Sequence, residues 1–350
     1  MTAPPRPVAA ADLAVGPPPA LEVDATGLPI DPLLLVEAED VMRVPGHARV
    51  LDALRATRRA TVAVSVHGRP VPEELSSVVD VVLSSRDGDR RTVAVASVDA
   101  ALQALADRFA TTPLAALGYV WLLRQSAELP VPAALSAESA LYSTLLAGPE
   151  FARWLTARGP ARAPDDRSTR VDVRREDDVL HLRLARPARR NAVDAAMRDA
   201  LVAALAPAEW DPALTVSITA EGPSFSAGGD LDEFGSAPDV ARAHVVRLAA
   251  GVGERIDRIR DRVTVHVHGT CLGAGFELPC FAGHVVAAPD TVLGLPELTM
   301  GLVPGAGGTV SIARRAGRWR TAWLGLTGER IDVATALAWG LVDEVTHPPA

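Results

Sequence analysis

Short strands that end in glycine alternate with helical segments in the second half of the chain, and this alternation restricts the fold more than any other feature. Residues 215–222, TVSITAEG, and residues 263–269, VTVHVHG, each alternate apolar and polar side chains before a terminal glycine. A helix is predicted from about Ala192 to Ala206, where apolar residues recur at helical spacing. Strands that alternate with helices in this way favour a layered α/β fold.

Two polar segments suggest how the chain is divided. Residues 1–25 carry prolines throughout and no continuous apolar run, which predicts a disordered leader rather than a signal peptide or membrane anchor. Residues 156–170 are polar and rich in Pro and Arg, and within them residues 161–170 are predicted to link an N-terminal region, residues 26–160, to a core spanning residues 171–350. The core opens with residues 171–187, whose alternation around a Glu-Asp-Asp turn predicts a hairpin.

The N-terminal region combines predicted strands with helices. Residues 61–68, 78–85 and 90–97 are strand-like. Residues 98–123 and 137–156 are helical by period and by their Ala-rich composition. A mostly helical α/β region is therefore expected before the core.

Charge and composition disfavour several classes of partner. The 350 residues carry 35 Lys and Arg against 43 Asp and Glu, and the net charge of −8 gives no long-range attraction for nucleic acid. No apolar stretch is long enough to span a bilayer. The two cysteines, Cys271 and Cys280, lack metal-ligand spacing and are typical of thiols in a reducing cytosol. A cytoplasmic protein without a metal site or membrane partner is expected.

Two glycine-rich turns follow predicted strands. Residues 223–231, PSFSAGGDL, place small residues where a backbone N–H can approach a ligand closely, although an ordinary glycine turn is the alternative. Residues 268–278, HGTCLGAGFEL, predict a turn that opens a helix, where unpaired N–H groups suit a developing negative charge. The second turn lacks the spacing of a P-loop or of a dinucleotide fingerprint, which disfavours nucleotide hydrolysis and hydride transfer.

A third segment places a glutamate in apolar surroundings. Within residues 294–309, Glu297 directly follows Pro296 in an apolar stretch. Desolvation there would raise the pKa of Glu297 and leave the side chain available as an acid. The alternative is a solvated loop glutamate.

In this order, the three segments resemble the enoyl-CoA hydratase/isomerase (crotonase) superfamily over about half of the chain. Residues 184–192 look like the first strand-to-helix turn of that family, and residues 328–345 contain further matches. The resemblance implies a crotonase-like spiral of ββα units, here with an N-terminal extension. It also implies a homo-oligomer, either a trimer or a hexamer.

The resemblance assigns catalytic roles residue by residue. The backbone N–H groups of Gly229 and Ala274 correspond to an oxyanion hole that holds the thioester carbonyl as it becomes an enolate. Loss of one such donor typically costs about 2.7–4 kcal/mol of transition-state stabilisation. Glu277 and Glu297 fall on the two acid/base positions, where Glu277 would activate water and Glu297 would deliver a proton to Cα.

Six residues look like those that line the CoA pocket of the family: Arg190, Ala192, Ala227, Asp230, Leu231 and Asp232. CoA would enter as part of an acyl-CoA substrate, and no separate cofactor is expected. Arg186, Arg189 and Arg190 would supply local positive charge for phosphates, with surface solvation as the alternative for each.

Two local features depart from the family pattern. Ala274 stands where glycine is common, which keeps the N–H but adds a methyl group. Pro279 enters the first turns of the helix after Glu277, where it would remove a hydrogen bond and shift Glu277 from the position that a hydratase gives it.

The family's C-terminal helices have no counterpart after the core, and residues 98–158 look like that tail placed before it. We expect a permuted arrangement in which the N-terminal region is a decayed copy of the core without a second active site. Its helices would replace the missing tail and bring Phe151, Arg153 and Arg158 near the adenine end of CoA.

Hydration of a 2-enoyl-CoA, or the reverse dehydration, is the leading functional prediction. Double-bond isomerisation would suit a lone Glu297. A cofactor-independent aryl-acetyl-CoA dioxygenase is suggested by the N-terminal extension, which the dihydroxyphenylacetyl-CoA dioxygenase also has, but retention of both Glu277 and Glu297 argues against it. A non-catalytic acyl-CoA-binding protein is the alternative from another class, and the intact glutamate pair with both backbone-donor turns disfavours it.

Overall fold

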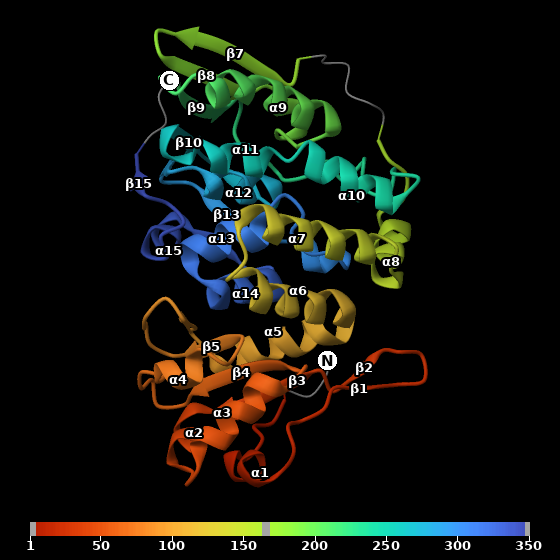
Figure 1. The fold of residues 1–350 in the computed structure, drawn as a ribbon, viewed down its shortest axis with the longest axis vertical. Helices are drawn as coiled ribbons and strands as arrows, with labels where there is room; N and C mark the ends of the chain where they lie inside the picture. The colour runs from red at the N-terminus through yellow and green to blue at the C-terminus, as the bar shows by residue number, and fades with distance from the viewer. Residues whose placement is uncertain (1–4, 163–168, 347–350) are drawn as a thin grey trace. The chain divides into compact units, whose positions relative to one another are not determined.

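The computed structural model describes residues 5–162 and 169–346, and the chain forms two compact units (Figure 1). The first contains Met1–Gln125 and Ala316–Thr327, and the second contains Ser126–Arg315 and Gly328–Ala350. The division therefore falls at residue 125 and not in the expected linker, residues 161–170, of which residues 163–168 lie outside the described part.

Residues 5–25 were expected to belong to a disordered leader, and the structure differs. They contain helix α1 (Ala10–Val15), whose Ala10 and Leu13 are buried in the hydrophobic core of the first unit. The burial of these apolar side chains stabilises the short helix although the flanking residues are rich in proline. Residues 1–4 of the expected leader lie outside the described part of the chain.

The first unit is built around a four-stranded parallel sheet in the order β3-β4-β5-β6. The strands are β3 (Leu33–Glu37), β4 (Ala60–Ser65), β5 (Val81–Ser84) and β6 (Thr92–Ala94). Every residue of β4 is buried, as is typical of a parallel strand covered on both faces. Strands β5 and β6 lie within predicted strand segments, and β4 begins one residue before its predicted segment, residues 61–68. Strand β3 had not been predicted.

Buried and partly buried polar contacts hold helices of the first unit to the residue before β5 and to one another. On α6, Arg124 donates two hydrogen bonds to the carboxylate of Asp80, at 2.7 and 2.6 Å. The Tyr119 hydroxyl donates to the carbonyl of Thr321 on α14, at 2.7 Å. The remaining elements of this unit are β1 (Glu22–Val23), β2 (Pro29–Ile30), α2 (Ala38–Arg43), α3 (His47–Ala56), α4 (Glu73–Ser76), α5 (Val98–Thr111), α6 (Pro113–Ser126) and α14 (Arg318–Thr327).

The second unit contains a six-stranded sheet in the order β15-β12-β10-β9-β8-β7. Strands β7 and β8 form the predicted antiparallel hairpin, with Asp177 at φ 49° in its turn, and the other neighbours pair in parallel. The six strands are β7 (Val171–Glu176), β8 (Val179–Leu184), β9 (Thr215–Ala220), β10 (Val263–Val267), β12 (His284–Ala287) and β15 (Glu344–Val345). A smaller sheet contains β11 (Thr270–Leu272), β13 (Val292–Gly294) and β14 (Arg330–Asp332).

Helices cover the sheets of the second unit. Two of them, α7 (Val131–Leu146) and α8 (Pro149–Arg158), come from the first half of the chain, and α7 lies against α10 and α11 (Figure 1). The other helices are α9 (Ala195–Trp210), α10 (Val240–Ala249), α11 (Val252–Arg258), α12 (Ala274–Glu277), α13 (Gly308–Ala316) and α15 (Val333–Ala338). Short 3-10 turns are η1 (Pro187–Arg189), η2 (Arg260–Arg262), η3 (Pro279–Phe281) and η4 (Glu297–Met300).

Mixed α/β architecture, as predicted, is thus present in both units. The helix predicted from Ala192 begins at Ala195 instead, because the Asp194 side chain caps it by accepting a hydrogen bond from the amide of Met197, at 2.8 Å. Within the described residues, no helix has the length and apolar character needed to cross a bilayer.

Candidate active site

The two glycine-rich turns meet after strands β9 and β10. Val193 pairs in parallel with Gly229, and Ser226 pairs in parallel with Cys271. A Cβ atom on Gly228, which has φ 98°, would lie 2.9 Å from the carbonyl oxygen of Leu272, so the contact requires glycine. This close approach brings the two predicted backbone donors to one cavity.

The backbone N–H groups of Gly229 and Ala274 donate no hydrogen bond to any residue that the structure describes. Ala274 is the first residue of α12, so its amide has no acceptor within the helix. The residues on either side of Gly229 do form hydrogen bonds. The Gly228 carbonyl accepts from the Val193 amide, and the Asp230 amide donates to the Val193 carbonyl. Backbone N–H groups rarely stay without an acceptor, so these two groups beside one cavity are available to donate to water or to a ligand.

The cavity has a volume of about 690 Å³, a size typical of small-molecule sites. The four residues predicted to be catalytic all line it: Gly229, Ala274, Glu277 and Glu297. Helices α7, α8, α9, α10 and α11 supply much of the remaining wall. The structure therefore brings together residues that lie far apart in the sequence, from Gly229 to Glu297.

Glu277 lies at the end of α12 and is 1% exposed. Its Oε2 accepts hydrogen bonds from the amides of Ala306 and Gly308, each at 2.8 Å. Burial raises the pKa of Glu277 to about 7, although these amides favour the ionised form. The expected intrusion of Pro279 into the helix does not occur, because α12 ends at Glu277 and Pro279 begins the separate turn η3.

Glu297 begins η4 and is 6% exposed, which excludes the solvated-loop alternative. Its Oε2 is buried and has no hydrogen-bond partner among the described residues. Burial, followed by the charge of Glu277, raises the pKa of Glu297 well above its ordinary value. A buried carboxyl group with one unpartnered oxygen is favoured in its neutral form, so Glu297 is suited to donate a proton.

A third glutamate, Glu138 of α7, lines the same cavity and had not been predicted. Its Oε1 accepts from the amide of Gly307 at 2.8 Å, and its Oε2 accepts from the amide and hydroxyl of Thr309 at 3.0 and 2.6 Å. Burial and the charge of Glu277 raise the pKa of Glu138 to about 8. The signal in the sequence was a single acidic residue in a helix otherwise made of apolar, small and aromatic residues.

Two aspartates among the predicted CoA-binding residues are engaged in ion pairs. Asp230 lines the cavity, and its Oδ2 lies 2.6 Å from the guanidinium of Arg186, which is itself buried. Asp232 pairs with Arg162 at 2.8 Å and with Arg189 at 3.5 Å. The charges of Arg186 and Arg189 are therefore largely balanced within the protein, which weakens the expectation that they bind phosphates.

The other predicted CoA-binding residues lie in the loops around the cavity rather than among its lining residues. The Ala227 amide donates to the Arg190 carbonyl at 2.9 Å, and the Ala192 carbonyl accepts from the Arg186 guanidinium at 2.9 Å. Leu231 is 41% exposed. Contact of these four residues with CoA stays a prediction.

Helix α8 supplies an aromatic patch beside the loop that carries Leu231. Phe151 lines the cavity and stacks on Trp154, with ring centroids 5.7 Å apart. The guanidinium of Arg158 lies 5.8 Å from the Trp154 ring centroid and donates a hydrogen bond to the Leu231 carbonyl, whereas Arg153 is exposed. Whether these side chains contact an adenine ring stays a prediction.

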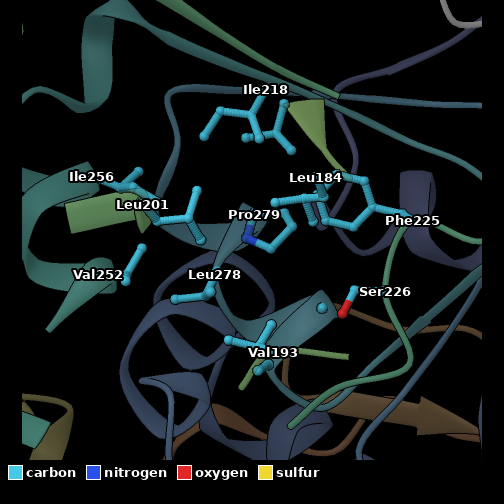
Figure 2. Close-up of a pocket in the computed structure, with 13 residues that line it drawn as sticks. Leu184, Val193, Leu201, Ile218, Phe225, Ser226, Val252, Ile256, Leu278 and Pro279 are labelled. Atoms are coloured by element: carbon cyan, nitrogen blue, oxygen red, sulfur yellow. The ribbon is translucent and has the colours of Figure 1, made fainter. Parts of the chain in front are cut away.

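A second, much smaller cavity lies in the apolar core beneath the turns (Figure 2). Its volume of about 20 Å³ has room for about one water molecule. Val193, Val252, Ala274 and Leu278 line both cavities. The hydroxyl of Ser226 donates a hydrogen bond to the Asn191 carbonyl at 2.8 Å. This small space belongs to the packing that supports the turns and is not suited to a ligand.

Among residues 5–162 and 169–346, no group of three His, Cys, Asp or Glu side chains is arranged to hold a metal ion. Cys271 and Cys280 are both buried as free thiols. Burial raises the pKa of each thiol, to about 12 for Cys280, so neither is a ready nucleophile.

Comparison with known proteins identifies the family. A model of the enoyl-CoA hydratase/isomerase family matches residues 174–348. The chain belongs to this family. It is an enzyme of the enoyl-CoA hydratase/isomerase type, and the predicted crotonase resemblance is confirmed.

Individual family members are similar over the same part of the chain. The 2,3-dehydroadipyl-CoA hydratase of Escherichia coli (strain K12) is 37% identical over 174 residues, which cover 49% of this chain and 68% of that protein. Among solved structures, the enoyl-CoA hydratase from Thermoplasma volcanium GSS1 is 33% identical, with 51% of this chain and 72% of that chain covered and a TM-score of 0.47. The enoyl-CoA hydratase from Mycobacterium smegmatis is 29% identical, with 51% and 71% covered and a TM-score of 0.48.

Proposed function

We propose that this enzyme catalyses the reversible hydration of a 2-enoyl-CoA thioester through an enolate held by two backbone amides. The observation that carries the proposal is the pair of unpartnered N–H groups of Gly229 and Ala274 in a cavity that also holds Glu277 and Glu297. Backbone donors placed around an oxygen that becomes negative stabilise the transition state, each by about 2.7–4 kcal/mol, and these two amides would supply them. CoA enters as part of the substrate.

The environments of the two glutamates support opposite roles. Glu277, with a pKa of about 7, is substantially ionised near neutral pH and takes a proton from the water that attacks Cβ. Glu297 is kept neutral by burial and gives its proton to Cα as the enolate collapses. The hydroxyl group is thereby added at Cβ and the hydrogen at Cα. Exchange of protons with solvent or between the two carboxyls then restores the starting state.

The chemistry of a relative suggests a substrate class. The similar protein from Escherichia coli is named for 2,3-dehydroadipyl-CoA, a 2-enoyl thioester whose chain ends in a carboxylate. A 2-enoyl-CoA with a second carboxylate is therefore a candidate substrate for this enzyme as well.

A panel of 2-enoyl-CoA thioesters, assayed by mass spectrometry for added water, tests the proposal. Glu277→Gln and Glu297→Gln should each lower kcat by about 10²- to 10⁴-fold, because each removes a positioned base or acid. Double-bond isomerisation is favoured instead if the wild-type enzyme moves the double bond without adding water, and if Glu277→Gln keeps this isomerase activity while Glu297→Gln loses it. Tight binding of the thioesters without water addition or isomerisation would overturn the hydratase proposal in favour of a binding protein.

A further inference from the structure

A polar cluster joins α7 to α10 in the wall of the cavity, and Arg247 lies at its centre. The Arg247 Nε donates to the Ser139 hydroxyl at 3.0 Å, and its Nη2 donates to the Ser139 carbonyl at 3.2 Å and to the Ser143 hydroxyl. The His244 Nδ1 lies 2.8 Å from the same Ser139 hydroxyl. The guanidinium also lies over the ring of Tyr142, 4.8 Å from its centroid. These contacts fix the orientation of Arg247.

The charge of Arg247 has no ion-pair partner among residues 5–162 and 169–346, since its contacts are hydroxyl groups, a carbonyl and an aromatic ring. The other two arginines that line the cavity differ, because Arg198 pairs with Asp199 at 2.7 Å and Arg242 pairs with Asp239 at 3.6 Å. Burial lowers the pKa of Arg247, and the charge of Glu138 opposes this shift although the two side chains form no ion pair. A half-buried cation without a counter-ion is costly and is stabilised by an anion that enters the cavity.

The ring of Tyr142 lies between Arg247 and the loop that binds Glu277. A Cβ atom on Gly305 would lie 2.5 Å from Cε2 of Tyr142, so this ring packs directly against the loop whose next residue, Ala306, binds Glu277. Arg247 contacts the same ring. The cation is therefore separated from the Glu277 loop by one side chain, and it contacts neither Glu277 nor the unpartnered amides. A group that reaches Arg247 belongs to a part of the ligand beyond the reacting carbons.

We propose that Arg247 binds a carboxylate at the far end of the acyl chain and makes the enzyme selective for 2-enoyl-CoA substrates with two acid groups. Guanidinium and carboxylate match in geometry and form charge-assisted hydrogen bonds, which are stronger than neutral ones. An acyl chain that ends in a methyl group leaves the cation without a counter-ion, and a site built in this way rejects it. The inference rests on the proposed function for its substrate but concerns binding alone.

Binding of saturated thioesters tests the inference apart from hydration, because adipyl-CoA and hexanoyl-CoA have acyl chains of equal length and neither can be hydrated. Isothermal titration of the full chain should show that adipyl-CoA binds at least about 10-fold more tightly than hexanoyl-CoA. Arg247→Met should weaken adipyl-CoA binding by about 10- to 100-fold, the effect of losing hydrogen bonds to a charged group, and leave hexanoyl-CoA binding nearly unchanged.

Two further variants control this experiment. Arg242→Met, on the same helix, removes a cation that already has a partner and should leave the ratio of the two affinities unchanged. Arg247→Lys keeps the charge and should keep part of the preference, which covers the case in which Arg247→Met fails to fold. The inference is wrong if the wild-type protein binds both thioesters equally, or if Arg247→Met and Arg242→Met change the ratio alike. Failure of hydration with intact selectivity for adipyl-CoA would overturn only the proposed reaction.

Discussion

Glu138 and Glu277, from different halves of the chain, accept hydrogen bonds from alternate amides at the start of helix α13. Of the four consecutive amides of residues 306–309, Glu277 binds the first and third, and Glu138 binds the second and fourth. The first amides of a helix have no partner within it and carry partial positive charge, so two acidic side chains stabilise them. The position of the proposed base Glu277 consequently depends on α7, which supplies Glu138.

Glu138→Ala should therefore weaken both stability and catalysis. The change leaves the amides of Gly307 and Thr309 without their acceptor and should lower the free energy of unfolding by about 1–3 kcal/mol. It should also lower kcat, because the loop that binds Glu277 loses half of its anchors. Chemical denaturation and the hydration assay measure the two effects. Glu138→Gln keeps one acceptor oxygen and should be intermediate, so a glutamine variant as unstable as the alanine variant would contradict the capping role.

The rate of hydration should follow a bell-shaped dependence on pH. Glu277 has to be ionised to act as a base, so kcat/KM should fall as the pH drops below about 7. Glu297 has to be protonated, and its raised pKa places the falling limb on the alkaline side. A profile that stays flat between about pH 5 and pH 7 would exclude Glu277 as the base.

Stability should decline with rising pH over a defined window. The folded-state pKa values of Glu277 and Glu138, about 7 and about 8, lie above the ordinary value of 4.5. Between pH 4.5 and about 8 the folded chain therefore holds protons that the unfolded chain has released, and the free energy of unfolding falls as the pH rises. The contribution is fully present below pH 4.5 and lost above about pH 8. Denaturation at a series of pH values measures it, and Glu138→Gln should make the decline less steep.

The strands and turns that carry the site were predictable because their signals are local. The hairpin β7–β8 and strand β9 follow from alternation over a few residues, and the turn around Gly229 follows from small residues directly after a strand. Strand β3 was missed because its short apolar run has no alternation that distinguishes a buried strand from a helix. Helix α1 was missed because proline content outweighed a short apolar pattern within it.

The site contacts that could not be predicted from the sequence join residues that lie far apart along the chain. Glu138 lies 169 and 171 positions away from the amides that it binds, and Arg247 lies 108 positions from Ser139. Nothing near either residue in the sequence specifies these contacts, which exist only once α7 packs against α10 and the start of α13. The ion pair of Arg186 with Asp230, 44 positions apart, was likewise not predicted from the sequence.

Gly273→Ala should selectively disable Glu297. A Cβ atom at residue 273 would lie 2.2 Å from Oε1 of Glu297, so the carboxyl has to move, and the loss of a positioned acid should lower kcat by about 10²-fold or more. Gly340→Ala is the matched control, since Gly340 also has a positive φ, 71° against 49°, but a Cβ there would meet its nearest atom, the Arg315 carbonyl oxygen, only at 3.8 Å. Both variants should lose about 1–3 kcal/mol of stability from backbone strain, measured by chemical denaturation. Only Gly273→Ala should lower kcat, because only there does the new methyl group displace Glu297. An equal loss of kcat in Gly340→Ala would mean that backbone strain alone accounts for the effect.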